Sequence, residues 1–386
     1  MSVFEGVAAS KISAEAQGSD GVVVVYSVNN LYGCRHEKAT HVGLAGKMAR
    51  LKGYTVAAES MLPRQGSGPV YVLPSDTLVG IEAAGALGVH CEDDLFGGVV
   101  PQAFVATKAI THPLVEPNAN APAGWSHAFG RRVSDVVLRG FSVFTVQDAR
   151  HAAARLLGYG AMRVKLVRAT AGRGQVVVAN AAELEAALDT MDRAELSSHG
   201  LVLEENLSDV VTFSVGQVRV ADLLVTYYGQ QRLTPDNSGA AVYGGSTLVV
   251  ARGGFDALDG FNPSEKARVA VRQARTYDAA AMECFPGFFA SRRNYDVARG
   301  RDGVGRWRSG VLEQSWRVGG ASGAEIAALE ALRAEPTLQA VQASTVELYG
   351  ESEPPPPHAS VYFRGLDEQV GYLTKYATVE SYVDPR

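Results

Sequence analysis

The amino-acid sequence predicts a protein of the mixed α/β and α+β class, in which a small parallel α/β domain precedes a larger α+β region. In the first third of the chain, short β-branched runs alternate with helical runs, a pattern typical of parallel sheets. Residues 210–252 are instead rich in Val, Thr and Tyr and indicate successive antiparallel strands. A chain of 386 residues is long enough for two or three domains with substantial cores.

The first region, residues 1–130, is expected to form the parallel domain. Its segment "GVVVVYSV" indicates a buried strand by its length and β-branching. Thr40 is a candidate cap for a helix through "HVGLAGKMARLK", which Gly53 would end. The apolar runs "YVLPSD" and "GGVVPQAFVA" predict further strands, with the helical "GIEAAGALG" between them. The loop-like "EPNANAPAGW" lies beside the expected boundary near residue 130.

The second region, residues 131–205, again alternates strands and helices. Thr145 opens a capping box, and the helix that follows would end at Gly158. The strand "AMRVKLV", the glycine loop "TAGRGQ" and the strand "VVVA" come next. A helix capped by Asn180 then leads to the strand "GLVLEENL", residues 200–207.

The third region, residues 206–335, contains the predicted antiparallel strands and two helices. Asn262 would cap the first helix, with proline at its first position, and Ser322 would cap the second. Between these helices, "RRNYDVA" and "GVLEQSWR" predict the two strands of a hairpin. The remaining residues, 336–386, form an extension in which the stiff "EPPPP" precedes a terminal hairpin.

Composition and charge exclude some classes of partner. The formal net charge is −5 and the sequence contains no basic block, so a nucleic-acid partner is not expected. No run is apolar enough to span a membrane, and no signal peptide is expected. Three widely spaced cysteines are typical of a reduced cytoplasm. His36 and His41 lie five residues apart without an obvious cluster of ligands, so we do not expect a zinc site there.

The stretch "SGVLEQSWRVGG", residues 309–320, is a candidate metal motif. On a strand, Glu313, Ser315 and Arg317 share one face, whereas the residues between them point the other way. A carboxylate beside a hydroxyl can ligate Mg²⁺, and an arginine can bind phosphate or carboxylate oxygens. Asp296, on the neighbouring predicted strand, could supply a second carboxylate. The alternative is a solvated strand face with an ordinary Glu–Arg pair.

A second candidate motif is "RVKLVRATAGRGQVVV", which could hold phosphates. Lys165 lies on a strand that runs into Gly172 and Gly174, and such glycines let backbone N–H groups approach phosphate oxygens. The segment lacks the third glycine of the dinucleotide-binding fingerprint and leads into a strand rather than a helix. No phosphate-binding loop of the G-x-x-x-x-G-K-[ST] type occurs.

The order of these motifs resembles the ATP-grasp superfamily. A strand lysine, a glycine loop, a capped helix, a strand ending in "LEEN" and a late hairpin with an acid and E-x-[polar]-x-R follow one another as in that superfamily. The resemblance covers residues 131–323, and residues 1–130 resemble the small α/β domain that usually precedes it. The whole chain also resembles a proteobacterial family of ATP-grasp-like proteins.

The resemblance implies a set of site residues. Two residues would act on the phosphates during catalysis, Lys165 and Arg317. The hinge would be residues 204–207, whose backbone would pair with the adenine edge. The nucleotide would be bound by the glycine loop, the hinge and an earlier cation, namely by Gly172, Arg173, Gly174, Gln175, Glu204, Glu205, Leu207 and Arg132, together with Lys165. The metal ligands would be Asp296, Glu313 and Ser315.

The sequence departs from the superfamily pattern in three places. Ser315 replaces the usual asparagine, and Gln314 could substitute only if the strand were bulged. The usual ribose-binding acid after the hinge is replaced by Val211 or Thr212. The earlier of the two ATP-contacting cations could be Arg131, Arg132 or the more distant Lys108.

The resemblance implies an enzyme that uses ATP and Mg²⁺. The expected activity is that of a carboxylate–amine or carboxylate–thiol ligase that forms an acyl phosphate on a small molecule or peptide. Alternatives are an ATP-grasp kinase, or a nucleotide-binding regulatory protein without turnover. The protein could also be a homodimer.

Overall fold

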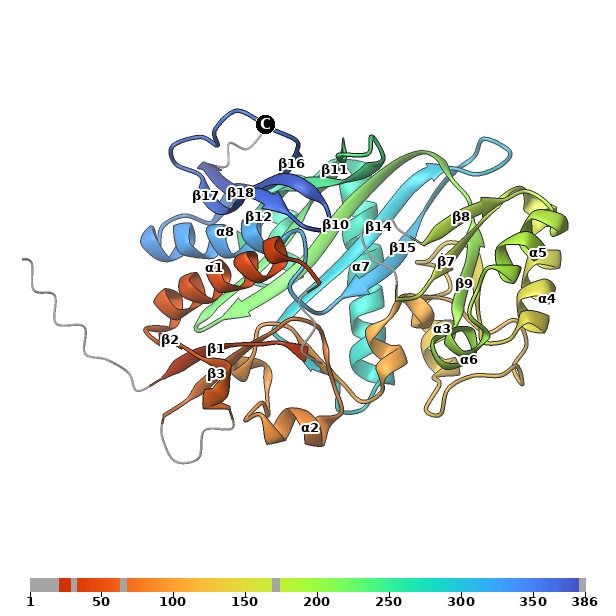
Figure 1. Ribbon diagram of the computed structural model, residues 1–386, viewed down its shortest axis with the longest axis horizontal. Helices are drawn as coiled ribbons and strands as arrows, with labels where there is room; N and C mark the ends of the chain where they lie inside the picture. Colours follow the sequence, from red (N-terminus) through yellow and green to blue (C-terminus); the bar gives the residue numbers. More distant parts are fainter. Residues whose placement is uncertain (1–20, 29–32, 63–67, 169–173, 382–386) are drawn as a thin grey trace, which may run out of the picture.

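The computed structural model describes residues 21–28, 33–62, 68–168 and 174–381. Four sheets organise this part of the chain, as Figure 1 shows. A three-stranded parallel sheet and an eight-stranded antiparallel sheet lie beside each other (Figure 1). A four-stranded sheet flanks the edge of the large one that is formed by β14 (Arg292–Arg301) and β15 (Trp307–Ser315). The mixed α/β and α+β class predicted from the sequence is therefore confirmed. The domain limits at residues 130, 205 and 335 stay predictions.

The parallel sheet has the order β2 (Thr55–Ala57), β1 (Val22–Tyr26), β3 (Val70–Pro74). Helix α1 (Arg35–Lys52) packs on β1 and ends at Gly53, whose φ of 69° is the left-handed conformation that favours glycine. The predicted start of this helix is wrong. The helix begins before Thr40, whose hydroxyl donates a hydrogen bond to the carbonyl of His36 at 2.8 Å.

Two short strands, β4 (Leu78–Val79) and β5 (Gly98–Val100), do not belong to this parallel sheet. They pair with each other in a separate three-stranded sheet. Strand β5 pairs antiparallel with β13 (Phe289–Ala290), which lies almost two hundred residues later. Helix α2 (Ile81–Ala86) lies between β4 and β5 along the chain. These pairings attach the first region firmly to the third.

The segment that follows β5 crosses from the first region to the others. It contains three helical elements: η4 (Ala103–Ala106), η5 (Lys108–Thr111) and α3 (His127–Val133). Their apolar side chains pack into one core with α7 (Glu265–Cys284) and with β10, β14 and β15 of the large sheet. This segment therefore positions residues near the β14–β15 hairpin.

The four-stranded sheet is antiparallel and has the order β6 (Gly140–Val143), β9 (Leu201–Glu205), β7 (Met162–Leu166), β8 (Gln175–Val178). Helices α4 (Val146–Leu156), α5 (Ala181–Asp189) and α6 (Arg193–His199) accompany it, and α4 and α5 lie on its outer side in Figure 1. The predicted caps are confirmed, because Thr145 accepts from Asp148 N and Asn180 from Glu183 N, each at 3.0 Å. The chain turns at Gly160, with φ 128°, rather than at Gly158.

The large sheet is antiparallel throughout. Its strands, in spatial order, are β15 (Trp307–Ser315), β14 (Arg292–Arg301), β10 (Ser208–Val220), β11 (Leu223–Pro235), β12 (Ala241–Arg252), β16 (Ala340–Tyr349), β18 (Gly371–Ser381) and β17 (Ser360–Asp367). Helix α7 packs on one face, whereas α1 and α8 (Ser322–Ala334) pack on the other. The predicted hairpins and central antiparallel strands are confirmed.

Both predicted caps in this region are wrong by one or two residues. Ser264, not Asn262, caps α7, because its hydroxyl accepts from the backbone N–H of Ala267 at 3.4 Å. Asn262 takes a left-handed conformation with φ 43° just before the helix. Ser322 is the first residue of α8 rather than its cap. Within the described residues, no helix combines the length and apolarity needed to cross a bilayer.

A buried ion pair joins the β14–β15 hairpin to α8. The guanidinium of Arg292 donates to both carboxylate oxygens of Glu325, at 2.8 and 2.7 Å, and both side chains are almost completely buried. The Glu325 carboxylate also contacts the hydroxyl of Tyr227 at 2.6 Å. Bidentate geometry with further hydrogen bonds is what a buried pair needs to offset desolvation.

Glu325→Ala is expected to lower the free energy of unfolding by about 3–5 kcal/mol, because it leaves Arg292 buried without a counter-charge. Urea-induced unfolding followed by circular dichroism measures the change. Glu283→Ala is the matched control, since Glu283 pairs with Arg132 at an exposed position and should leave stability nearly unchanged. Small, equal losses in both variants would contradict a central role for the buried pair.

Candidate functional site

The β14–β15 hairpin brings the predicted acidic residues together. In its register, Asp296 lies opposite Glu313 and Asn294 lies opposite Ser315, with a bulge after Asp296. Side chains on directly opposite residues of an antiparallel pair are close neighbours. Asp296 and Asn294 also share a face, because they are two residues apart on one strand.

The face of β15 follows the predicted alternation. Glu313, Ser315 and Arg317 are partly exposed, whereas Gln314 and Trp316 are buried on the opposite side. The side-chain amide of Gln314 donates to the backbone carbonyls of Val105 and Thr107, at 3.0 and 2.8 Å. Gln314 is therefore committed to the core and does not take the place of the usual asparagine.

Asp296 is partly buried beside a second carboxylate. Burial raises its pKa to about 6, and the neighbouring negative charge of Glu313 adds to the rise. Asn294 Nδ2 donates to Asp296 Oδ1 at 2.9 Å, and the hydroxyl of Ser214 lies 3.5 Å from the same oxygen. The site holds a carboxylate that is costly to ionise unless a cation approaches.

Lys108 is the cation that the structure places beside these acids. Its ammonium lies 2.8 Å from Glu313 Oε2, and its side chain is 5% exposed. The structure does not bring Arg132 to this site: Arg132 is exposed on α3 and lies 2.9 Å from Glu283. Arg131 is exposed on the same helix.

Lys165 faces a buried carboxylate on the neighbouring strand. Its ammonium forms an ion pair with Glu204, which also accepts from His112 Nε2 at 3.1 Å. Burial opposes ionisation of Glu204, but the Lys165 charge and the His112 hydrogen bond outweigh it and hold the pKa at about 2. Glu204 is therefore ionised and fixes the position of the lysine.

Residues 107–112 connect the two halves of the site. Lys108 contacts Glu313 on β15, and four residues later His112 contacts Glu204 on β9. The hydroxyl of Thr111 is 3.0 Å from that of Tyr277 on α7, which anchors the segment to the core. The spacing between Lys108 and His112 thus depends on one short segment that is anchored to the core.

The remaining hinge residues have structural contacts. The Glu205 carboxylate accepts from Arg139 N at 3.0 Å and from Arg308 Nε at 3.3 Å, on the side of β9 opposite Glu204. Leu207 is buried in a small cluster that joins the four-stranded sheet to β14. The backbone role that the sequence predicts for the hinge stays a prediction.

The glycine loop is only partly described. Gly172 and Arg173 lie outside the described residues. Gly174 has φ 62° and its carbonyl accepts from Leu166 N at 3.0 Å. Gln175 lies opposite Lys165 in the β7–β8 ladder.

Ser315 and Arg317 both have partners. The hydroxyl of Ser315 accepts from Arg292 Nη1 at 3.3 Å. Arg317 Nε lies 3.3 Å from Asp76 Oδ1, just beyond the end of β3 in the parallel sheet. Arg317 therefore lies at the carboxyl end of parallel strands, where open α/β sheets commonly bind ligands.

A cavity of about 750 Å³ lies away from these charged groups. It is bordered by Val164 and Leu166 on β7 and by residues of α5 and α6. Since successive strand residues point to opposite faces, this cavity lies on the face of β7 opposite Lys165. Its lining is mostly apolar, as expected of the space beneath two helices.

Two site residues were missed by reasoning from the sequence, and a third was named only as the more distant of three alternatives. Asn294 has a detectable signal, since it lies two residues before Asp296 and so shares its face. Lys108 was an alternative to Arg131 and Arg132, although it lies further before "VLRGFSV" than they do. His112 has no sequence signal, because its contact with Glu204 spans 92 residues.

Comparison with known families gives one match. A family model described as "Protein of unknown function (DUF3182)" matches residues 24–377, which is most of the chain. None of the curated proteins compared with the sequence matches it.

Several solved structures are similar over nearly the whole chain. The N5-carboxyaminoimidazole synthetase from Staphylococcus aureus complexed with ADP has a TM-score of 0.50 and 14% identity, covering 95% of this chain and 94% of its own. The carboxyaminoimidazole ribonucleotide synthase from Aspergillus clavatus complexed with ATP has a TM-score of 0.50 and 14% identity, covering 94% of each chain. The biotin carboxylase domain of Hydrogenobacter thermophilus 2-oxoglutarate carboxylase, complexed with MgADP, has a TM-score of 0.50 and 10% identity, covering 94% and 87%. The chain has the ATP-grasp fold, as the sequence predicted.

Asp296→Asn is expected to stabilise the metal-free protein at neutral pH. The pKa of Asp296 is raised from 3.8 to about 6 on folding, so the wild-type free energy of unfolding decreases as pH rises through that interval. The variant does not lose this stability, so near neutral pH its free energy of unfolding exceeds that of the wild type by about 3 kcal/mol. The advantage disappears below about pH 4, where both side chains are uncharged.

Thermal unfolding in EDTA across this pH range measures the difference. Asp209→Asn is the control, because Asp209 is exposed and pairs with Arg301 only at 3.6 Å. An Asp296→Asn protein whose stability relative to wild type did not vary with pH would contradict the raised pKa.

Proposed function

The chain belongs to the family described as "Protein of unknown function (DUF3182)", and we propose that it is an ATP- and Mg²⁺-dependent ligase. It joins a carboxylate to an amine or thiol through an acyl phosphate. The observation that carries this proposal is the pairing of Asp296 with Glu313 on one rung of the β14–β15 hairpin, within an ATP-grasp fold. Lys108, which contacts Glu313, and Lys165 add two buried cations.

The acidic pair fits a magnesium ion. Asp296 and Glu313 offer carboxylate oxygens, and the facing Asn294 and Ser315 offer an amide and a hydroxyl oxygen. Mg²⁺ prefers such hard oxygen ligands and retains phosphate oxygens and waters in its shell. A bound cation would lower the raised pKa of Asp296 and favour its ionised form. Bound there, Mg²⁺ supplies neutralisation of the charge on the transferring phosphoryl group.

Asn294 compensates for the unusual Ser315 in this proposal. The usual asparagine is absent from position 315, but an asparagine faces that position from the partner strand. Its amide already donates to Asp296 Oδ1 at 2.9 Å. We assign Asn294 the task of orienting Asp296, while the Ser315 hydroxyl, bonded to Arg292, is an auxiliary ligand.

Lys165 and Lys108 hold the phosphates in this proposal. Glu204 holds Lys165 in place, and His112 holds Glu204 in place. Lys108 exchanges part of its contact with Glu313 for a phosphate oxygen. Phosphoryl transfer needs little beyond such positioning and charge stabilisation, so no nucleophilic side chain is required.

The chemical steps balance with ADP and phosphate as products. A carboxylate oxygen attacks the γ-phosphorus of ATP, and the bond from that phosphorus to the β-phosphate oxygen breaks to release ADP. The amine or thiol then attacks the acyl carbon, loses a proton and expels phosphate with its electron pair. Arg317, at the end of the parallel sheet beside Asp76, is placed to bind the carboxylate of a small molecule or peptide.

Hydroxylamine trapping tests the ligase directly. With ATP, Mg²⁺ and pools of carboxylates that include bicarbonate, hydroxylamine should convert an acyl phosphate into a hydroxamate, with ADP released in equal amount. Asp296→Asn should suppress both products, since the metal loses one of two anionic ligands. A stable phosphorylated product that hydroxylamine leaves intact would instead identify a kinase. ATP binding without ADP release from any pool would identify a regulatory protein.

Lys108→Ala is expected to weaken ATP binding roughly 10- to 100-fold, because it removes one charged hydrogen bond to phosphate. Arg132→Ala is the matched control and should bind ATP like wild type, since Arg132 lies elsewhere on an exposed helix. Isothermal titration with a non-hydrolysable ATP analogue measures both affinities. If Arg132→Ala bound ATP more weakly than Lys108→Ala, Arg132 rather than Lys108 would be the residue that contacts the phosphates.

Lys165→Met should also weaken ATP binding, but alone it leaves Glu204 buried without its cation. The double variant Lys165→Met/Glu204→Gln removes that penalty and keeps the protein folded. Loss of ATP affinity in the folded double variant supports a phosphate contact. Wild-type affinity in it would contradict the assignment.

A further inference from the structure

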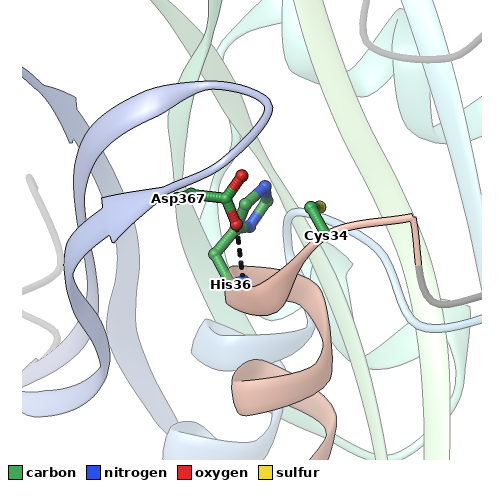
Figure 2. Close-up of side chains that lie close together, drawn as sticks. All are labelled: Cys34, His36 and Asp367. Atoms are coloured by element: carbon green, nitrogen blue, oxygen red, sulfur yellow. Dashed lines mark hydrogen bonds between the residues drawn. The ribbon is translucent and has the colours of Figure 1, made fainter.

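A second group of potential ligands lies far along the chain from the acidic pair. Cys34, His36 and Asp367 each place a ligand atom within 4.8 Å of those of the other two. Figure 2 shows the three side chains converging, two from the start of α1 and one from the end of β17. The first and last of these residues are more than three hundred positions apart, so the fold alone creates the group.

The backbone at this point explains the convergence. Cys34 is the N-cap residue of α1 in an extended conformation, and His36 lies in the first turn. Asp367 ends β17 at the tight turn into β18, and β17 packs against α1. His36 and Asp367 are buried, whereas Cys34 is partly exposed.

Surrounding contacts already fix two of the three ligands. Asp367 Oδ2 accepts from His36 N at 3.0 Å, and Oδ1 accepts from Gln369 N at 2.9 Å. The ring of His36 packs edge-on against Phe363, with centroids 6.1 Å apart. A carboxylate that accepts backbone hydrogen bonds keeps further lone pairs for a metal, and such outer contacts orient metal ligands.

Acidic side chains lie near the thiol, and metal binding would displace its proton. Burial raises the pKa of Cys34 to about 12, and the negative charges of Glu37 and Asp367 raise it further. The ammonium of Lys375 lies 3.5 Å from His36 Nδ1 and is paired with Glu347 at 2.9 Å. Burial and Lys375 together lower the pKa of His36 and favour the neutral imidazole that binds metals.

We propose that Cys34, His36 and Asp367 bind one Zn²⁺ ion with three protein ligands, leaving a fourth position for water. One thiolate, one imidazole and one carboxylate form a donor set suited to tetrahedral zinc. The set differs from the all-oxygen pair at Asp296 and Glu313, so this site is independent of the proposed ligase activity.

The bound ion would join the two ends of the chain. Helix α1 packs on the parallel sheet, and β17 is the outermost strand at one edge of the large sheet. A metal ligated by both adds its binding free energy to the stability of the folded state. The site therefore ties the C-terminal hairpin β17–β18 to the first region.

Cobalt substitution tests this proposal on the full chain under thiol-free reducing conditions. Co²⁺ should produce a thiolate-to-cobalt charge-transfer absorption and intense tetrahedral d–d bands. Cys34→Ser should abolish the charge-transfer absorption and weaken Zn²⁺ binding by at least about tenfold. Cys91→Ser is the matched control, because Cys91 is exposed and lies outside the group, and it should behave as wild type.

Competing outcomes are distinguishable in the same experiment. Co²⁺ held at Asp296 and Glu313 would give weak octahedral bands without charge transfer, and those bands would disappear in Asp296→Asn. Wild-type protein that shows only such bands, or a Cys34→Ser protein that keeps the charge-transfer absorption, overturns the proposal. Zn²⁺ should also raise the melting temperature of the wild type and of Cys91→Ser, but not of Cys34→Ser.

Discussion

The register of one antiparallel hairpin places two carboxylates on the same rung, and the surrounding structure compensates for that placement. Asp296 and Glu313 could not lie opposite each other at low cost without nearby positive charge. Lys108 supplies it for Glu313, while Asn294 and Ser214 hold Asp296 with neutral donors. The balance is incomplete, and the remaining negative charge is the physical basis for the metal binding that we propose.

Two buried ion pairs hold the strands of the candidate site in place. Arg292 and Glu325 join the hairpin to α8 in a bidentate contact. Lys165 and Glu204 join two neighbouring strands of the four-stranded sheet. Breaking such pairs is costly because the remaining charge has no water to solvate it. Both pairs therefore stabilise the positions of groups that act on charged ligands, which is the arrangement that electrostatic catalysis requires.

The crossing segment, residues 107–112, explains how two sheets cooperate in one site. Lys108 reaches β15 and His112 reaches β9, so any displacement of one sheet changes the surroundings of the other. The chain reaches this segment directly after β5, which pairs with β13 of the third region. The first region is thus part of the site's framework rather than an appendage.

Local patterns along the chain were sufficient to predict the strands, the order of the motifs and several helix caps. Thr145 and Asn180 cap helices as predicted because a cap depends on residues three positions apart. The start of α1 was missed because Thr40 resembles a cap, although its hydroxyl bonds backward to His36 within the helix. Alternation also placed Asp296 and Glu313 on facing strands, since a two-residue period needs no tertiary information.

Tertiary structure alone decided which cations and which distant ligands join these local elements. Lys108 rather than Arg132 reaches Glu313, because proximity in space depends on how the crossing segment packs and not on spacing along the chain. The contacts of His112 with Glu204, and of Asp367 with the start of α1, form between elements that lie far apart in the sequence. The sequence by itself determined the ATP-grasp order of elements and the acidic hairpin, because these depend on local period and turn chemistry. The burial, pairing and ionisation of the site residues depend on long-range packing, which sets the dielectric surroundings and the neighbouring charge of each group.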